Sequence, residues 1–210
     1  SVMLRTGRTE EAKENAEKVG EMLRSTGANK IVVSCAGCLK TLREDYTEMG
    51  IDIPEVLHIV EYAEKLIEEG KLKPRRLPNE HRVTYHDPCH LVRGHGVREE
   101  PRAIIRSLPW VEFVEMRDSD RCCGGGGSFS LLHYDLAKGI TRRKVEAIRD
   151  ADVDIVATEC QSCVMQLADA LAQAGLDVAV MSIAELITQG RGAGRRTALG
   201  DGTRRSPESV

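Results

Sequence analysis

From Cys89 to Cys163 the sequence follows the pattern Cys-x32-Cys-Cys-x36-Cys-x2-Cys, and its adjacent pair runs straight into glycines as Cys122-Cys-Gly-Gly-Gly-Gly127. Five of the seven cysteines in the 210-residue chain lie in this stretch: Cys89, Cys122, Cys123, Cys160 and Cys163. The other two, Cys35 and Cys38, repeat the Cys-x-x-Cys that closes the pattern. We interpret the rest of the chain as a scaffold for these thiols.

Both Cys-x-x-Cys motifs follow a short β-branched run, at 30–34 and 153–157, and both open a helical pattern. The motifs are 125 residues apart, and at this offset, with one residue of slippage, the segments that follow also align. The sequence therefore predicts an α/β fold of two pseudo-symmetric halves, each a small, mainly parallel sheet flanked by helices. The cysteines should lie at strand ends and helix starts, where sites form in such sheets.

Periodicity and turn residues divide the chain further. They predict helices at 9–24, 39–46, 59–69, 99–108, 131–150 and 164–174, and strands at 30–34, 50–53, 82–85, 111–115 and 153–157. The charged, proline-containing segment 70–78 is a predicted linker. We expect 1–78 to be the C-terminal part of a first cysteine-rich repeat, 79–188 a complete second repeat, and 189–210 a disordered tail.

The first repeat lacks part of its motif. At the 125-residue offset, the counterparts of Cys122 and Cys123 would fall just before Ser1. We therefore expect Cys35 and Cys38 to be half of a second, incomplete metal site.

Composition restricts the function classes. A formal charge of −3 provides no basic face for nucleic acid. No apolar run approaches the roughly 20 residues of a membrane span, and no secretory leader is visible. We therefore expect a cytoplasmic protein, in which thiols stay reduced and bind metal in preference to forming a disulfide framework.

Four interpretations of the cysteines compete. Buried structural cysteine would explain one or two of them. A dithiol switch at a Cys-x-x-Cys would leave Cys89 and the adjacent pair without a role. A tetrahedral zinc site needs four ligands, one fewer than the pattern offers. An iron–sulfur cluster fits best, because adjacent thiolates can serve neighbouring irons and Gly124 and Gly125 let backbone N–H groups approach the sulfurs.

The pattern resembles the CCG-type cysteine-rich domain, which occurs twice in the B-type and D-type catalytic subunits of heterodisulfide reductases and also in glycolate oxidase and lactate-utilisation iron–sulfur proteins. Three stretches carry the resemblance: Tyr85-His-Asp-Pro-Cys-His-Leu91, Cys122-Cys-Gly-Gly-Gly126 and Val33-Ser-Cys-Ala-Gly-Cys38. The chain departs from the family at His90-Leu-Val-Arg93, where the usual sequence resembles His-Leu-Gly-Arg. It also lacks the ferredoxin-type cysteine segments of several relatives.

The resemblance implies an iron–sulfur electron-transfer subunit of an oxidoreductase, with ferredoxin-like iron–sulfur or flavin subunits as partners. It implies a [4Fe-4S] cluster, noncubane in the heterodisulfide reductase branch, with these ligands: Cys89, Cys122, Cys123, Cys160 and Cys163. The cluster would cleave a disulfide in that branch, or relay electrons from a flavin subunit in the glycolate and lactate branch. The alternative is a zinc-stabilised interaction subunit without redox activity. His86, His90 and His95 flank Cys89; His90 is the candidate catalytic proton donor, and packing at the strand end is the competing role.

Overall fold

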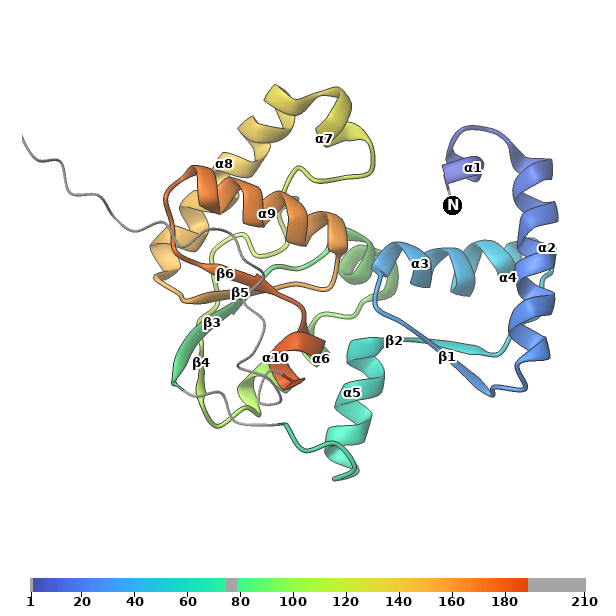
Figure 1. Cartoon of the computed structure of the whole chain (residues 1–210), viewed down its shortest axis with the longest axis horizontal. Coiled ribbons are helices and arrows are strands. Elements are labelled where there is room, and N and C mark those ends of the chain that lie inside the picture. The colour runs from blue at the N-terminus through green and yellow to red at the C-terminus, as the bar shows by residue number, and fades with distance from the viewer. Residues whose placement is uncertain (1, 75–78, 189–210) are drawn as a thin grey trace, which may run out of the picture.

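The computed structural model describes residues 2–74 and 79–188, so the predicted tail and part of the predicted linker lie outside the described residues. The predicted fold class is confirmed: the fold is α/β, with two parallel sheets of strand order β1-β2 and β4-β3-β5-β6, flanked by helices. Figure 1 shows the two sheets side by side, with the helix α3 lying along β1 and β2.

The first half contains the shorter sheet. Its elements are α1 (Val2–Arg5), α2 (Thr9–Ser25), β1 (Lys30–Val33), α3 (Ala36–Lys40), the π-helical segment η1 (Thr41–Asp45), α4 (Tyr46–Glu48), β2 (Glu55–His58) and α5 (Ile59–Glu68). The second half contains the larger sheet. Its elements are β3 (His81–Tyr85), the π-helical segment η2 (His90–Gly94), α6 (Glu99–Arg106), β4 (Val111–Phe113), α7 (Phe129–Leu132), α8 (Tyr134–Ala151), β5 (Ile155–Ala157), α9 (Gln161–Gln173), β6 (Ala179–Met181) and α10 (Ile183–Thr188).

Two predicted elements differ from the structure. The strand predicted at 50–53 is wrong, because pairing begins at Glu55, after Pro54, which has no N–H to give to a ladder. Ile51 instead packs under α2 and is 9% exposed. The helix predicted at 131–150 is broken at His133, whose φ of −133° and ψ of 52° separate α7 from α8.

The internal repeat is visible in the strand register. Lys30 pairs with Glu55 in the first half, and Ile155 pairs with Ala179 in the second. The first strands are therefore 125 residues apart and the second strands 124, which is the single-residue slippage seen in the sequence. Two cysteines, Cys35 and Cys160, precede α3 and α9 in the same extended conformation, with ψ values of 119° and 118°.

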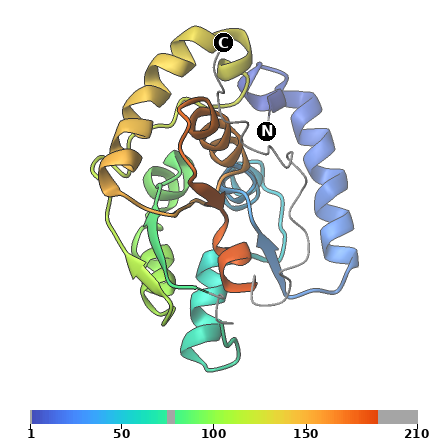
Figure 2. The same cartoon turned by 60° about the vertical axis from the view of Figure 1, so that its left-hand side comes forward.

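The larger sheet is covered on both faces, as a parallel sheet requires. Alternate residues of β5 divide between two cores: Ile155 and Ala157 pack toward α6 and α10, and Val156 packs toward α8 and α9. Figure 2 shows α10 beside α5, and α5 also packs against α6. One core consequently contains Leu39 and Val60 of the first half together with Tyr85 of the second.

Within residues 2–74 and 79–188, no helix is both long and apolar enough to span a bilayer.

Candidate metal centre

The five cysteines of the central pattern come from four places in the second half. Cys89 lies between β3 and η2, and Cys122 and Cys123 lie in the loop between β4 and α7. Cys160 precedes α9, and Cys163 is in its first turn. The carboxyl ends of β3 and β5, which pair directly, thus bring together segments that are distant in the sequence.

Four of these thiols lie close enough to shift one another's pKa values. The Sγ atoms of Cys123 and Cys163 lie within 4.8 Å of each other. The side chains of Cys122 and Cys163 lower the pKa of Cys123, and the side chain of Cys163 lowers the pKa of Cys160 to about 6. Cys89 is close enough for its charge to raise the pKa of Cys122, a smaller effect than that of Cys123. The arrangement therefore favours thiolates at Cys123 and Cys160.

The start of α9 supports one of those thiolates. After the larger effect of the Cys163 side chain, the backbone N–H groups of Cys163 and Ser162 in the first turn of α9 also lower the pKa of the Cys160 thiol. The first turn of a helix leaves such N–H groups without intrahelical partners and carries partial positive charge. The helix therefore stabilises the negative charge on Cys160.

Two glycines allow the cysteine loop to approach the helices. Gly124 has φ +87° and donates its N–H to the sulfur of Cys122 at 3.3 Å. A Cβ at Gly124 would stand 2.7 Å from the carbonyl oxygen of Ala137, and one at Gly125 would stand 2.7 Å from that of Ser162. Only residues without a side chain fit at these two positions.

A buried ion-pair network fixes the loops on either side of the cysteines. Arg102, which is 3% exposed, donates to both carboxylate oxygens of Asp87 at 2.9 and 2.8 Å and to those of Glu115 at 2.8 Å. It also reaches Ser119 Oγ at 3.2 Å. Burial alone would raise the pKa of Asp87, but the Arg102 hydrogen bonds lower it below its usual value. Asp87 is therefore a charged anchor two residues before Cys89.

Lys144 on α8 holds the same loop from the other side. Its ammonium group donates to the backbone carbonyls of Asp118 and Ser119, and the residue is 1% exposed. Burial lowers the pKa of Lys144 to about 8, and the nearby Cys123 thiolate opposes this shift. The group places positive charge behind the cysteines.

The remaining predicted residues lie at the junction of the halves. Cys35 and Cys38 begin α3, which packs against η2. A Cβ at Gly37 would be 3.7 Å from Cys35 Sγ and 3.9 Å from Nδ1 of His90, so exposed His90 lies beside the first Cys-x-x-Cys. Burial, and then the charge of Cys35, raises the pKa of Cys38. Among the described residues of the first half, Cys35 and Cys38 are the only cysteines.

Sequence reasoning missed Arg102 and Lys144. Each lies inside a predicted helical segment, and charged helix residues are usually exposed. A signal was available: Lys144 shares a helix face with Thr141 and Ile148, which are both buried. A charged residue on an otherwise buried stripe must have a partner inside the protein.

The cysteine pattern also identifies the chain by comparison. The model of the CCG cysteine-rich domain matches residues 1–43 and 83–168, which include all seven cysteines. The chain belongs to the CCG cysteine-rich domain family. The match therefore covers Cys35 and Cys38 in the first half and the five-cysteine pattern in the second half.

Three members of this family show its range. A fumarate reductase (CoM/CoB) subunit of Methanothermobacter marburgensis is 42% identical over 188 residues, 89% of this chain and 37% of that protein. A dihydromethanophenazine:CoB–CoM heterodisulfide reductase subunit of Methanosarcina acetivorans is 36% identical over 91% of this chain and 49% of its own length. EtfAB:quinone oxidoreductase of Syntrophomonas wolfei is 31% identical over 80% of this chain and 25% of its own length. The chain thus spans less than half the length of these relatives.

Among solved structures, glutamate racemase from Bacillus anthracis aligns with 85% of this chain and 62% of its own at 13% identity, with a TM-score of 0.37. This likeness is too weak to bear on function.

Proposed function

We propose that the chain is the iron–sulfur electron-transfer part of an oxidoreductase complex of the heterodisulfide reductase type. Its cluster would be bound by the thiolates of the second motif, which are Cys89, Cys122, Cys123, Cys160 and Cys163. The observation that carries the proposal is the convergence of these thiols. The Sγ atoms of Cys123 and Cys163 lie within 4.8 Å of each other, and Cys122, Cys160 and Cys89 are near enough to take part in mutual pKa shifts. Family members named as iron–sulfur or heterodisulfide reductase proteins support the same assignment.

The donor set fits a cluster better than a single ion. Five thiols exceed the four positions of a structural zinc ion, whereas several irons can share them. The Gly124 N–H that already donates to a cysteine sulfur is the kind of contact that tunes a cluster's potential. Zinc, as a structural ion in an interaction subunit, remains the second candidate because four of the thiols could bind it.

The bound group would supply one-electron chemistry, and the chain's own residues would do the rest. Arg102 and Lys144 hold the cysteine loop through Ser119. Lys144 adds a positive charge that offsets thiolate charge at Cys123. The glycines bring backbone N–H groups to the sulfurs. Cys122 is exposed, so the site is open to a substrate or an electron partner on that side.

The finer assignments belong to the same proposal. A [4Fe-4S] cluster, noncubane as in the heterodisulfide reductase branch, is the type we favour, with a disulfide as substrate class and a 2-hydroxy acid as the competitor. Ferredoxin-like or flavin subunits would exchange electrons with the cluster in the cytoplasm, where thiols stay reduced. We assign residues 1–78 and 79–188 to two successive repeats, and Cys35 and Cys38 to a second, incomplete site.

The test is metal analysis of protein purified without oxygen. Wild-type protein should contain about four irons and as many sulfides per chain and should show broad visible absorption. Cys123→Ser and Cys163→Ser should each lower the iron content at least several-fold. Ala172→Ser, an exposed change on the same helix as Cys163, should leave it unchanged.

Two results would count against the proposal. Iron that is unchanged in both cysteine variants would place the cluster elsewhere. Colourless protein with about one zinc per chain would favour the structural role instead.

A further inference from the structure

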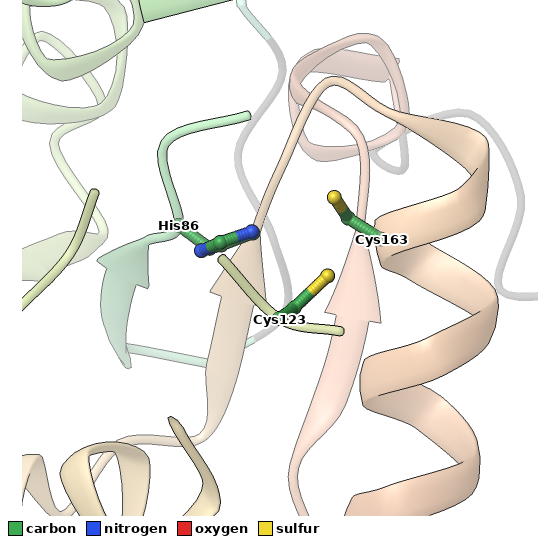
Figure 3. Close-up of side chains that lie close together, drawn as sticks. All are labelled: His86, Cys123 and Cys163. Atoms are coloured by element: carbon green, nitrogen blue, oxygen red, sulfur yellow. The ribbon is translucent and has the colours of Figure 1, made fainter. Parts of the chain in front are cut away.

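His86 is a buried imidazole beside the cysteines of the proposed site. It is the first residue after β3 and is 1% exposed. One of its ring nitrogens and the Sγ atoms of Cys123 and Cys163 all lie within 4.8 Å of one another. In Figure 3 the three side chains come from separate segments and point into one space, with a ring nitrogen turned toward the sulfurs.

This spacing suits a shared metal. Ligands of one tetrahedral metal, with bonds of about 2.0 Å to nitrogen and 2.3 Å to sulfur, stand about 3.5 to 3.8 Å apart. The group His86, Cys123 and Cys163 has 4.8 Å as its upper limit. The difference is about 1 Å, which rotation about the cysteine Cα–Cβ bonds can close.

The tautomer of His86 is set by a backbone carbonyl. Nδ1 lies 3.1 Å from the carbonyl oxygen of Ser119. Because a carbonyl only accepts hydrogen bonds, Nδ1 must carry a proton, and in the neutral ring Nε2 then has a free lone pair. Histidines that bind metals commonly hold their other ring nitrogen in this way, and the contact fixes the ring orientation.

The Ser119 carbonyl is itself held in place. It also accepts from the backbone N–H of Asp87 at 3.1 Å and from the ammonium group of Lys144 at 3.1 Å. The Oγ atom of Ser119 accepts a hydrogen bond from Arg102. The ring of His86 is therefore oriented by a hydrogen-bond network rather than by packing alone.

We propose that His86 is an additional ligand of the metal centre, bound through Nε2 beside Cys123 and Cys163. The inference rests on the proposed function, since it needs a metal centre at these cysteines. Its consequence is a mixed nitrogen and sulfur ligand set. At the position of His86, a neutral imidazole stabilises the reduced state more than an anionic thiolate would, so the reduction potential of the cluster is higher than with a cysteine there.

The test is nitrogen hyperfine spectroscopy of the full chain with its iron loaded. Protein with ¹⁴N- or ¹⁵N-labelled histidine is brought to its paramagnetic state and examined by pulsed electron–nuclear double resonance. We expect a strong coupling from directly bonded nitrogen that changes with the isotope. It should vanish in His86→Cys and persist in His90→Gln. His86→Cys keeps a ligand at the position, so it should retain its iron and show a lower midpoint potential.

Each remaining outcome has one meaning. Iron-loaded protein with only weak histidine coupling would reduce His86 to a hydrogen-bond partner and overturn the inference while the proposed function stands. Strong coupling that survives in His86→Cys would also overturn it. A chain that binds no iron would overturn both.

Discussion

Three adjacent glycines provide a graded test of how the cysteine loop is packed. An alanine at Gly124 would place its Cβ 2.7 Å from the carbonyl oxygen of Ala137 and 2.8 Å from Thr141 Oγ1, at φ +87°. At Gly125 the Cβ would stand 2.7 Å from the carbonyl oxygen of Ser162, and φ is not positive. At Gly126 nothing lies within 4 Å.

The expected losses of unfolding free energy follow from these contacts. Overpacking costs about 1–3 kcal/mol, and a left-handed backbone with a Cβ adds about 1–2 kcal/mol. Gly124→Ala should therefore destabilise by about 2–5 kcal/mol and Gly125→Ala by about 1–3 kcal/mol. Gly126→Ala should stay within about 0.5 kcal/mol of wild type. Since a domain of ordinary stability has about 5–15 kcal/mol, the largest loss is easily measured.

The assay is urea unfolding of the metal-free chain, monitored by far-ultraviolet circular dichroism. The midpoints of variants are compared where the unfolding free energy depends on urea concentration with the same slope. Iron content after reconstitution gives a second readout. Gly125→Ala should lower it, because the new Cβ pushes the loop away from Ser162, the neighbour of Cys163. Equal midpoints for the Gly124→Ala and Gly126→Ala variants would refute this account of the loop.

Two further predictions concern buried charge. Burial lowers the pKa of His58 from 6.5 to about 4. Between these two pH values the unfolded chain therefore binds more protons than the folded chain. The free energy of unfolding should fall by up to about 3 kcal/mol as the pH drops from about 6.5 to 4. Unfolding at a series of pH values should show this loss in wild type and in His133→Asn but not in His58→Asn, and parallel curves for all three would contradict it. Arg102→Met should cost about 3–5 kcal/mol in urea unfolding, because it leaves the Asp87 carboxylate buried and unpaired. Arg106→Met, at a side chain that is 52% exposed, should cost less than about 1 kcal/mol. Equal losses of unfolding free energy in the two variants would contradict the cost assigned to an unpaired, buried Asp87.

The fold class was predictable from the sequence because two signals agreed. The β-branched run before each Cys-x-x-Cys predicted a strand, and both strands lie in parallel sheets. Their expected burial holds for β5 but not for β1, which is half-exposed. The 125-residue repeat predicted two similar halves. The error at 50–53 came from an alternation of Ile51 and Ile53 that serves packing under α2. Local alternation cannot distinguish a paired strand from an extended segment with one buried face.

The candidate site was only partly accessible to sequence reasoning. Cysteine spacing was sufficient to nominate the five thiols, although the ligand assignment stays a prediction until iron is measured. The supporting groups could not be nominated in the same way, because Arg102 and Lys144 act through a backbone carbonyl and a hydroxyl of Ser119. Backbone partners leave no pattern in a sequence. His86 stood in the resemblance motif, but its orientation toward Cys123 depends on the folded loop.

The core that contains Leu39, Val60 and Tyr85 crosses the boundary between the two halves of the chain. Neither half could therefore be removed without exposing apolar surface of the other. A cut between residues 74 and 79 should accordingly yield two fragments that stay associated and can be reassembled after co-expression.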